Sequence, residues 1–261
     1  MSNDLVLVIG GTRSTGLHAA KALQREGARV RVLARKPEKA LGRLSSHAEI
    51  VCGDVTNKDS LAAAFAGVSH VIFTAGVRSG RFARQSVVRA TEYEGILNTI
   101  EAAHAHNFRG RFVYMTSIGV TRKSLFAFGL NLWKGNTIVW RRRAEEALRS
   151  CGFDYTIVRA ALLLNRPPNQ RAIRVRQLES PLNLHECVAR ADVAEALVAA
   201  VSHPDASRAT FEVRWDRGPR QRASWPELLS GLRPDSATPS PTLRLDGSET
   251  HGQRRSRESL P

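Results

Sequence analysis

The sequence predicts one α/β domain built on a doubly wound, mainly parallel sheet, with a flexible C-terminal tail. Three observations support this prediction. Short β-branched runs alternate with helical patterns along the first half of the 261-residue chain. The strand runs are nearly continuous in apolar residues, which is typical of strands buried on both faces. A glycine-bearing loop, GGTRSTG, joins the first of these runs to the first helical pattern.

The expected strands and helices follow one another in the order of a parallel sheet with right-handed crossovers. Seven segments are expected to be strands: 5–10, 29–35, 48–54, 70–76, 111–117, 154–160 and 209–216. Alanine and leucine at helical spacing predict helices within 15–27, 36–44, 57–67, 86–107, 138–150 and 190–203. Ser224 and Glu227 have the spacing of a capping box, so a short helix is expected after Ser224.

Residues 1–217 are expected to form the main domain, and residues 218–261 the short helix and the flexible tail. Within the main domain, the basic segment 161–190 contains two adjacent prolines that exclude a continuous helix. This segment leaves the carboxyl end of a strand, where ligands bind in open α/β sheets. We interpret it as a substrate-side loop or lid, and a surface insertion without a role is the alternative. From about Arg233 the chain has few apolar residues and cannot offset its ordering entropy by burial.

The composition excludes several classes of protein. The three cysteines form no CxxC pair, which argues against a disulfide scaffold and against a structural zinc site, and no metal is expected. No apolar run approaches the roughly 18 residues of a membrane span. The N-terminal apolar run is too short for a signal-peptide core with normal flanks. We therefore expect a cytoplasmic protein without membrane contact.

The chain is strongly basic, with a net charge of +15 from 39 lysines and arginines against 24 acidic residues. Such a charge fits a nucleic acid, an anionic surface or a polyanionic cofactor. The arginines are spread along the chain and no zinc-finger spacing, RNP-like strand or long basic helix accompanies them. Nucleic-acid binding is therefore disfavoured but left open, and a solvated basic surface is the simpler interpretation.

The loop GGTRSTG has the context of a dinucleotide-binding site. Gly10 ends the first strand, where the backbone must turn, and Gly16 begins the first helix, where a side chain would obstruct packing on the strand. Backbone amides at the start of that helix can bind a pyrophosphate, and hydroxyl groups in the loop add further donors. The loop residues expected to bind the cofactor are Gly10, Thr12, Arg13, Ser14, Thr15 and Gly16.

The second strand ends in Arg35 and Lys36, where an NAD site usually has an acidic residue for the ribose 2′-hydroxyl. An arginine can hold a 2′-phosphate bidentately. Arg13 in the neighbouring loop could reach the same phosphate, so the pair favours NADP(H) as cofactor. A solvated surface charge is the alternative for each residue. Further cofactor contacts are expected after the third and fourth strands, from Asp54, Val55, Thr74, Ala75 and Gly76.

Six segments between residues 5 and about 215 carry a family resemblance: VLVIGGTRSTG, LARKPEKA, GDVTN, VYMTSIGV, IVWRRRAEEALRSCGFDYTIVRA and RADVAEAL. With these segments the chain resembles the short-chain dehydrogenase/reductase superfamily, in its atypical branch of NAD(P)-binding proteins similar to NmrA-like and flavin-reductase-like proteins. The resemblance implies a Rossmann-type domain, NADP(H) bound over the strand ends, and a small variable C-terminal substrate region.

The resemblance also implies a catalytic set, of which this chain has a part. Ser117 matches the serine that polarises a substrate carbonyl. Arg141 stands at the position of the lysine that binds the nicotinamide ribose, and Thr137 stands where the proton-donating tyrosine is expected. Threonine is a far poorer acid than tyrosine, and arginine stays charged and does not shuttle protons. The cofactor site is therefore expected to be intact, while the acid/base site is expected to be degraded.

Two functional hypotheses follow from this contrast. The first is an NADP(H)-dependent oxidoreductase that transfers hydride to a small conjugated or aromatic acceptor, which takes its proton from water. The second is a non-catalytic NADP-sensing regulator or assembly factor that acts through a protein partner, and the missing tyrosine favours it. The sequence does not reveal the small-molecule substrate.

Overall fold

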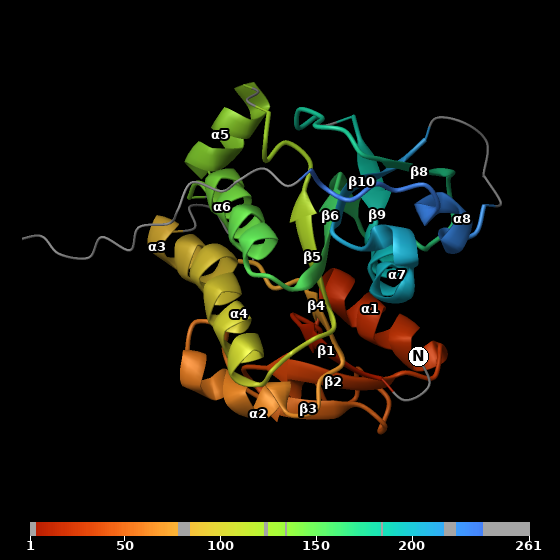
Figure 1. The fold of residues 1–261 in the computed structure, drawn as a ribbon. Coiled ribbons are helices and arrows are strands. Elements are labelled where there is room, and N and C mark those ends of the chain that lie inside the picture. Colours follow the sequence, from red (N-terminus) through yellow and green to blue (C-terminus); the bar gives the residue numbers. More distant parts are fainter. Residues whose placement is uncertain are drawn as a thin grey trace, which may run out of the picture.

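The computed structural model describes residues 4–77, 84–122, 125–133, 135–183, 185–216 and 223–236. Their centre is an eight-stranded sheet with the strand order β3-β2-β1-β4-β5-β6-β10-β8 (Figure 1). All neighbouring strands in it are parallel except β8, which runs antiparallel to β10. The predicted doubly wound, mainly parallel sheet is confirmed. Its strands are β1 (Leu5–Ile9), β2 (Arg29–Ala34), β3 (Glu49–Cys52), β4 (His70–Phe73), β5 (Arg111–Ser117), β6 (Asp154–Ala160), β8 (Ile173–Arg176) and β10 (Ala209–Trp215).

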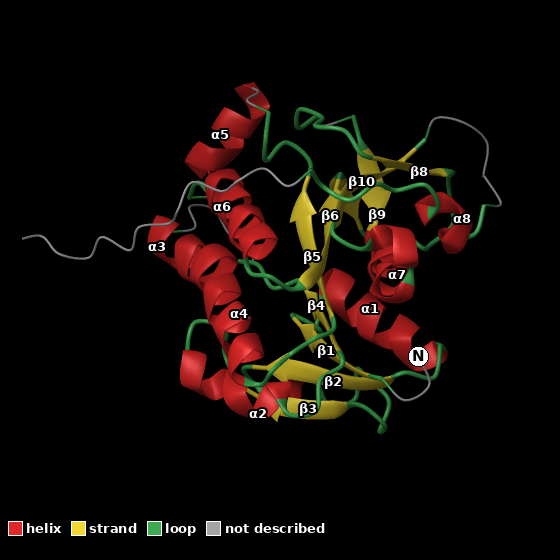
Figure 2. Ribbon diagram, in the orientation of Figure 1, coloured by secondary structure: helices red, strands yellow, loops and turns green. Residues whose placement is uncertain are grey.

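Helices cover both faces of the sheet (Figure 2). Helices α1 (Ser14–Arg25) and α7 (Arg190–Ser202) lie on one face. Helices α2 (Ala62–Phe65), α4 (Gly95–Ala105) and α6 (Thr137–Ser150) lie on the other. Strand β1 shows how the apolar run serves both layers: Val6 and Val8 pack in the cluster under α1, while Leu7 and Ile9 pack in the opposite cluster. Alternation along a strand sends successive side chains to opposite faces.

Two expected helices differ in the structure. Segment 36–44 forms only a short 3-10 turn, Pro37–Lys39, and Gly42 beyond it has a φ of +76°, a left-handed conformation that ends helical geometry. Segment 86–107 is helical but is not one regular helix. It divides into α3 (Gln85–Arg89), a π-helical turn Ala90–Glu94, and α4. A π-helical turn inserts an extra residue into the helical repeat, and such turns are frequent at functional sites.

The expected irregular loop at 161–190 is partly wrong, because the segment contains three strands. β7 (Leu162–Leu164) and β9 (Cys187–Ala189) form a separate parallel pair, and β8 adds to the edge of the main sheet beside β10. Residues 161–183 and 185–189 contain no helix, as the prolines predict, and α7 begins at Arg190. Three-residue strands are too short to show a hydrophobic period, which explains why the sequence does not reveal β7 and β9.

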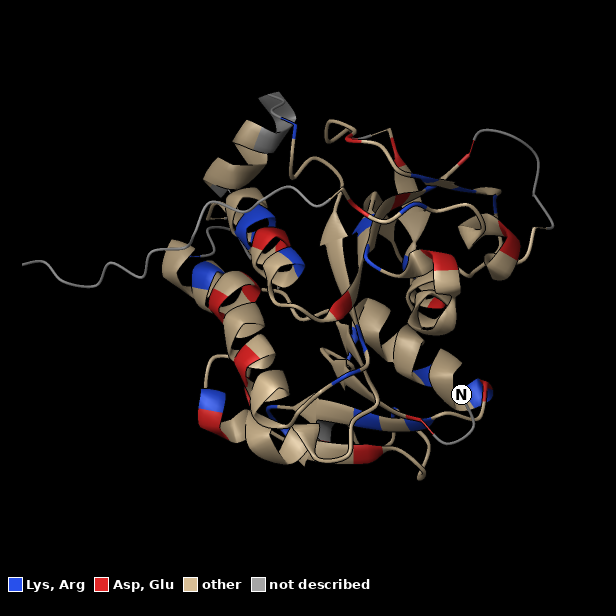
Figure 3. Cartoon of the chain, viewed as in Figure 1, with Lys and Arg blue, Asp and Glu red and all other residues tan. Residues whose placement is uncertain are grey.

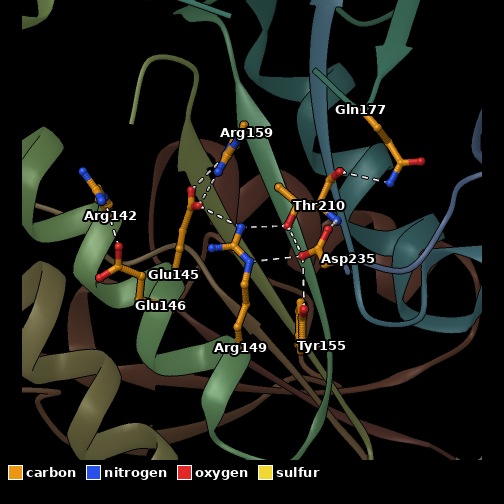
Figure 4. A network of polar contacts seen from close by, with 9 residues as sticks. All are labelled: Arg142, Glu145, Glu146, Arg149, Tyr155, Arg159, Gln177, Thr210 and Asp235. Carbon is orange, nitrogen blue, oxygen red and sulfur yellow. Dashed lines mark hydrogen bonds and ion pairs between the residues drawn. The ribbon is translucent and has the colours of Figure 1, made fainter. Parts of the chain in front are cut away.

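The C-terminal segment is anchored further than expected. Helix α8 (Trp225–Leu229) begins with the predicted capping box between Ser224 and Glu227. Beyond it, the Asp235 carboxylate accepts hydrogen bonds from Tyr155 Oη at 3.1 Å, Arg149 Nε at 3.1 Å and Thr210 Oγ1 at 2.6 Å (Figure 4). The expected flexible tail therefore does not begin at Arg233. Its remaining part, residues 237–261, lies outside the described residues.

Asp235 belongs to a larger buried network between α6, β6 and β10. The Glu145 carboxylate is fully buried and pairs with the guanidinium groups of Arg159 and Arg149 (Figure 4). Arg149 in turn bridges Glu145 and Asp235. Charge pairing with good hydrogen-bond geometry is the condition under which a carboxylate tolerates such burial. The network ties α6 and the C-terminal segment to the sheet.

Candidate functional site

The carboxyl ends of β1 and β4 meet at the point where the strand order reverses, which is where open α/β sheets bind ligands. Gly10 has a φ of +88°, and a Cβ atom there would lie 2.7 Å from Thr74 Oγ1. At Gly16 a Cβ atom would lie 2.4 Å from the Gly10 carbonyl oxygen. Both positions therefore require glycine, because neighbouring atoms leave no space for a Cβ. Thr74 has a structural role: its hydroxyl donates to the Ile9 carbonyl at 3.0 Å and links the ends of β4 and β1.

The start of α1 has the properties of an anion site. Helix α1 begins at Ser14, has no side-chain cap and carries no acidic residue in its first turn. Its positive end is therefore not compensated within the helix. Thr15 Oγ1 is buried there without a hydrogen-bond partner in the part of the chain that the structure describes. An uncapped helix start and a spare hydroxyl both fit a bound pyrophosphate.

The two arginines expected at one phosphate point to opposite sides of β1. Arg13 Nη2 donates to the Gly76 carbonyl at 3.4 Å, on the side of β4. Arg35 lies on the side of β2 and β3, is 73% exposed, and has Nη1 3.9 Å from the Asp54 carboxylate. The structure therefore does not bring Arg13 and Arg35 together. Arg13 extends from the loop after β1 toward β4, whereas Arg35 follows the end of β2 on the other edge of β1.

A different arginine contacts the glycine loop. Arg43 Nη1 donates to the Thr12 carbonyl at 3.3 Å, so this guanidinium contacts the glycine loop from the turn after β2. The sequence analysis missed Arg43, because nothing in the local pattern around Gly42 shows that the chain turns back toward the loop. Arg35 and Arg43 are the basic residues that the structure places on the β2 side of the loop.

Asp54 and Val55 lie at the end of β3, as expected, but their polar groups already have local partners. Asp54 Oδ1 accepts hydrogen bonds from the amide and the hydroxyl of Thr56 at 2.9 and 3.0 Å. Val55 is buried, and its carbonyl accepts from Asn98 Nδ2 at 2.8 Å. The two residues thus shape the turn after β3 and attach it to α4. The neighbouring Ala75 packs partly buried against the same core.

Thr137 and Arg141 meet a residue that the sequence analysis did not single out. Glu92, on the π-helical turn, is 3% exposed and faces both of them. Thr137 Oγ1 donates to Glu92 Oε2 at 2.5 Å, and Arg141 donates through Nε at 2.9 Å and through Nη2 at 3.4 Å. The Val77 amide after β4 donates to Glu92 Oε1 at 3.2 Å. Four donors therefore converge on one buried carboxylate.

The hydrogen bonds to Glu92 make the Thr137 hydroxyl and the Arg141 guanidinium unsuited to acid/base chemistry. The only proton of the Thr137 hydroxyl is directed at Glu92 rather than at the space above the sheet edge. Burial opposes the charge of Arg141, but the Glu92 carboxylate outweighs it, so the pKa of Arg141 is raised and the side chain stays ionised. Burial also raises the pKa of Tyr114, on the neighbouring strand β5. The Thr137 hydroxyl and the Arg141 guanidinium are therefore both committed to Glu92.

Ser117 lies at the carboxyl end of β5, next to this cluster in the strand order. Its Oγ is buried and has no hydrogen-bond partner among the described residues. A buried hydroxyl without a partner is costly unless a ligand or water completes it. Thr116 Oγ1 on the same strand and Trp140 Nε1 on α6 are buried without a described partner as well. Of these groups, Ser117 Oγ is the one at the carboxyl end of β5, and it has hydrogen-bonding capacity left for a bound molecule.

Comparison with known proteins places the chain in a family. Residues 10–204 match a family model described as NAD(P)H-binding. The chain belongs to this NAD(P)H-binding family. The resemblance to atypical short-chain dehydrogenases/reductases is thereby confirmed, together with its Rossmann-type fold.

Relatives of this NAD(P)H-binding protein include reductases and larger proteins. Sanguinarine reductase of Eschscholzia californica is 28% identical over 245 residues, which cover 80% of this chain and 88% of the relative. Protein TIC 62, chloroplastic, of Oryza sativa is 29% identical over 174 residues, which cover 60% of this chain and 35% of the relative. The chain thus spans about a third of the length of TIC 62.

Solved structures show the same fold. A putative NAD-dependent epimerase/dehydratase from Bacillus halodurans has a TM-score of 0.69 at 24% identity, covering 83% of this chain and 96% of that one. ChuY, an anaerobilin reductase from Escherichia coli O157:H7, has 0.67 at 19% identity, covering 83% and 100%. A short-chain dehydrogenase/reductase from Veillonella parvula, solved with NADP, has a TM-score of 0.64 at 16% identity, covering 84% of this chain and 97% of that one.

In the described ranges no helix combines the length and apolar character that a bilayer crossing requires.

Proposed function

We propose that the protein is an NADP(H)-dependent oxidoreductase that transfers hydride to a small conjugated or aromatic acceptor. The observation that carries the proposal is the junction of the β1 and β4 ends, where the Gly10 and Gly16 contacts leave no room for a side chain. This junction brings the uncapped start of α1 to the sheet edge, where a pyrophosphate can accept from its amides. The family match and the reductases among the similar proteins support the reaction class.

The preference for NADP(H) rests on the β2 side of the loop. Arg35 is exposed at the end of β2, and Arg43 contacts the loop carbonyl of Thr12. Two guanidinium groups there favour a 2′-phosphate over a hydroxyl, because they offer bidentate, charge-assisted hydrogen bonds. Arg13 has a separate role in this proposal. Through Gly76 it fixes the end of β4, beside the nicotinamide half of the cofactor.

The proposed class of acceptor follows from the lack of a proton donor at Thr137 and Arg141 on α6. When bound, NADPH supplies the hydride. Ser117 Oγ would orient the acceptor by a hydrogen bond, since it has no partner in the described structure. Thr137 and Arg141 donate hydrogen bonds to Glu92, which also accepts from the Val77 amide after β4. They would therefore fix the segment after β4 and would not donate a proton to the acceptor. An acceptor that delocalises the arriving electron pair needs no acid from the enzyme, and its proton, where one is needed, comes from water.

A non-catalytic NADP-binding regulator or assembly factor is the second candidate. The same Glu92 cluster favours it, because the position of the proton-donating tyrosine is held by a threonine whose hydroxyl is already committed. TIC 62 shares the matched region with this chain. In this candidate the cofactor would change the affinity for a protein partner instead of reducing a substrate.

Fluorescence titration with NADPH and NADH tests the cofactor assignment. We expect Arg35→Ala and Arg43→Ala each to lower NADPH affinity about tenfold, the value of one charge-assisted hydrogen bond, and to leave NADH affinity unchanged. Arg29→Ala is the matched control, because Arg29 is an exposed arginine at the opposite end of β2. Equal affinity of the wild type for the two cofactors would overturn the NADP(H) assignment.

Turnover distinguishes the two candidate functions. NADPH oxidation would be followed by absorbance with a quinone, a free flavin, a cationic nitrogen heteroaromatic and a simple aldehyde. We expect oxidation with the conjugated acceptors and none with the aldehyde, which requires a proton donor in step with the hydride. Tight NADPH binding without turnover on any acceptor would replace the oxidoreductase proposal by the regulator.

A further inference from the structure

A basic groove runs along α1, on the face of the sheet that α1 shares with α7. Its volume is about 950 Å³, and its walls are α1, the turn at 43–45, the loop at 165–168 and the first turns of α7. Lysines and arginines are distributed over helices and strands across the molecule (Figure 3). In this groove, three separate segments of the chain place lysine and arginine side chains around one cavity. The groove lies along the length of α1, whereas the proposed cofactor site lies at the start of that helix.

The charge of the groove is unbalanced. Helix α1 contributes Lys21 and Arg25, the turn after β2 contributes Arg43, and the loop after β7 contributes Arg166. Among the described lining residues the carboxylate is Glu195, which lies 3.9 Å from Arg25. Lys21, Arg43 and Arg166 have no ion pair within the described part of the chain. Clustered cations without countercharges raise the local concentration of anions.

The walls are held by hydrogen bonds that keep the groove open. Gln24 Nε2 donates to Ser45 Oγ at 2.7 Å, which ties α1 to the turn after β2. Arg190 Nη1 donates to Asn165 Oδ1 at 2.8 Å and to the Leu163 carbonyl at 3.1 Å, which fixes the loop that carries Arg166. A site whose walls are already positioned loses less entropy when a ligand binds.

His18 lies in the same groove, one helical turn before Lys21. Partial burial and the charges of Lys21 and Arg190 lower the pKa of His18, so its ring is neutral near pH 7. A neutral imidazole can donate one hydrogen bond and accept another.

We propose that this groove binds a small phosphorylated ligand, with the phosphate held by Lys21 and Arg166 and the organic part against Pro167 and Pro168. The volume lies within the range of about 300–1,000 Å³ that is typical of small-ligand sites. Sites for single-stranded nucleic acid combine a basic groove with aromatic rings on which bases stack. The described lining of this groove contains prolines, alanine and polar residues but no Phe, Tyr or Trp. The chemistry therefore favours a small phosphate ester over a nucleic acid.

Calorimetric titration of the full chain with phenyl phosphate tests the site, and inorganic phosphate and oligothymidylate are the comparison probes. Saturating NADPH is present in one series and absent in the other. We expect saturable one-to-one binding of phenyl phosphate in both series, with inorganic phosphate binding more weakly because it lacks the organic part. Loss of NADPH binding alone would contradict the proposed function and leave this site intact, so the two failures are distinguishable.

The double variant Lys21→Ala/Arg166→Ala is expected to lower the affinity for phenyl phosphate at least about tenfold, because each removed cation takes away a charge-assisted contact. The matched control, Lys58→Ala/Arg142→Ala, removes the same charge from exposed positions elsewhere and should stay within about twofold, since distant exposed charges are screened by salt. All four residues are exposed, so neither variant should affect folding. Equal losses in both variants, binding that does not saturate, or binding of oligothymidylate alone would overturn the proposal.

Discussion

The substitution Gly16→Ala tests the loop geometry on which the cofactor assignment depends. A Cβ atom at residue 16 would lie 2.4 Å from both the Gly10 carbonyl oxygen and Thr74 Oγ1. Carbon–oxygen contacts in proteins are tolerated from about 3.3 Å, so the start of α1 would have to move by about 0.9 Å. Overpacking of this kind costs about 1–3 kcal/mol of unfolding free energy. The same movement withdraws the helix amides from the pyrophosphate, and we expect NADPH affinity to fall at least about tenfold.

Urea unfolding and fluorescence titration with NADPH measure the two effects in Gly16→Ala. The matched control is Gly129→Ala in α5 (Leu125–Trp133), since no atom lies within 4 Å of the added Cβ and its backbone is helical. Alanine favours a helix over glycine by up to about 1 kcal/mol, so the control should be as stable as the wild type or more stable, with unchanged NADPH affinity. A Gly16→Ala protein with wild-type stability and wild-type NADPH affinity would refute the reasoning.

Three further substitutions have defined outcomes. Glu92→Gln leaves Arg141, whose side chain is 27% exposed, without its countercharge. We expect the unfolding free energy measured in urea to fall by about 2–4 kcal/mol, with partial recovery in Glu92→Gln/Arg141→Met. An unchanged urea midpoint would contradict this expectation. Burial and the Asp235 carboxylate raise the pKa of Tyr155 to about 12, above its value of about 10 in the unfolded chain. The protonated phenol therefore contributes stability that is complete below pH 10 and is lost toward pH 12, and Tyr155→Phe should flatten that part of the stability–pH curve. Ser224→Ala removes the cap of α8 and should cost about 1 kcal/mol, seen as faster hydrogen exchange of the α8 amides; unchanged exchange would argue against the cap.

The Glu92 cluster explains why the motif comparison gave an incomplete picture of the site. Compared with the family motif position by position, Thr137 and Arg141 indicate the loss of the catalytic tyrosine and lysine. In the structure they form a matched set with Glu92, which accepts from both side chains and from the Val77 amide. The set is a structural connection between α6, the π-helical turn and the end of β4. Its presence directs the search for a substrate toward acceptors that need no protein acid.

The sequence by itself determined the parallel strands, most of the helices and the glycine loop, because each depends on a local pattern: apolar runs, helical spacing, or a glycine at a required turn. It also located Ser117, Thr137 and Arg141 through their order along the chain. Only the tertiary structure decided their partners. Glu92 is 45 residues before Thr137, and Arg43 is 31 residues after Thr12, so no local pattern shows that they meet.

The tertiary structure also decided the direction of each arginine and the extent of the C-terminal segment. Arg13 turns toward β4 and Arg35 stands at the end of β2, and the two side chains diverge because β2 and β4 pair with opposite edges of β1. Asp235 is anchored although its surroundings in sequence are polar, since buried hydrogen-bond partners on α6, β6 and β10 replace the water that its carboxylate loses. Local patterns specify which elements form, whereas the pairing of polar side chains depends on distances that exist only after the elements have packed.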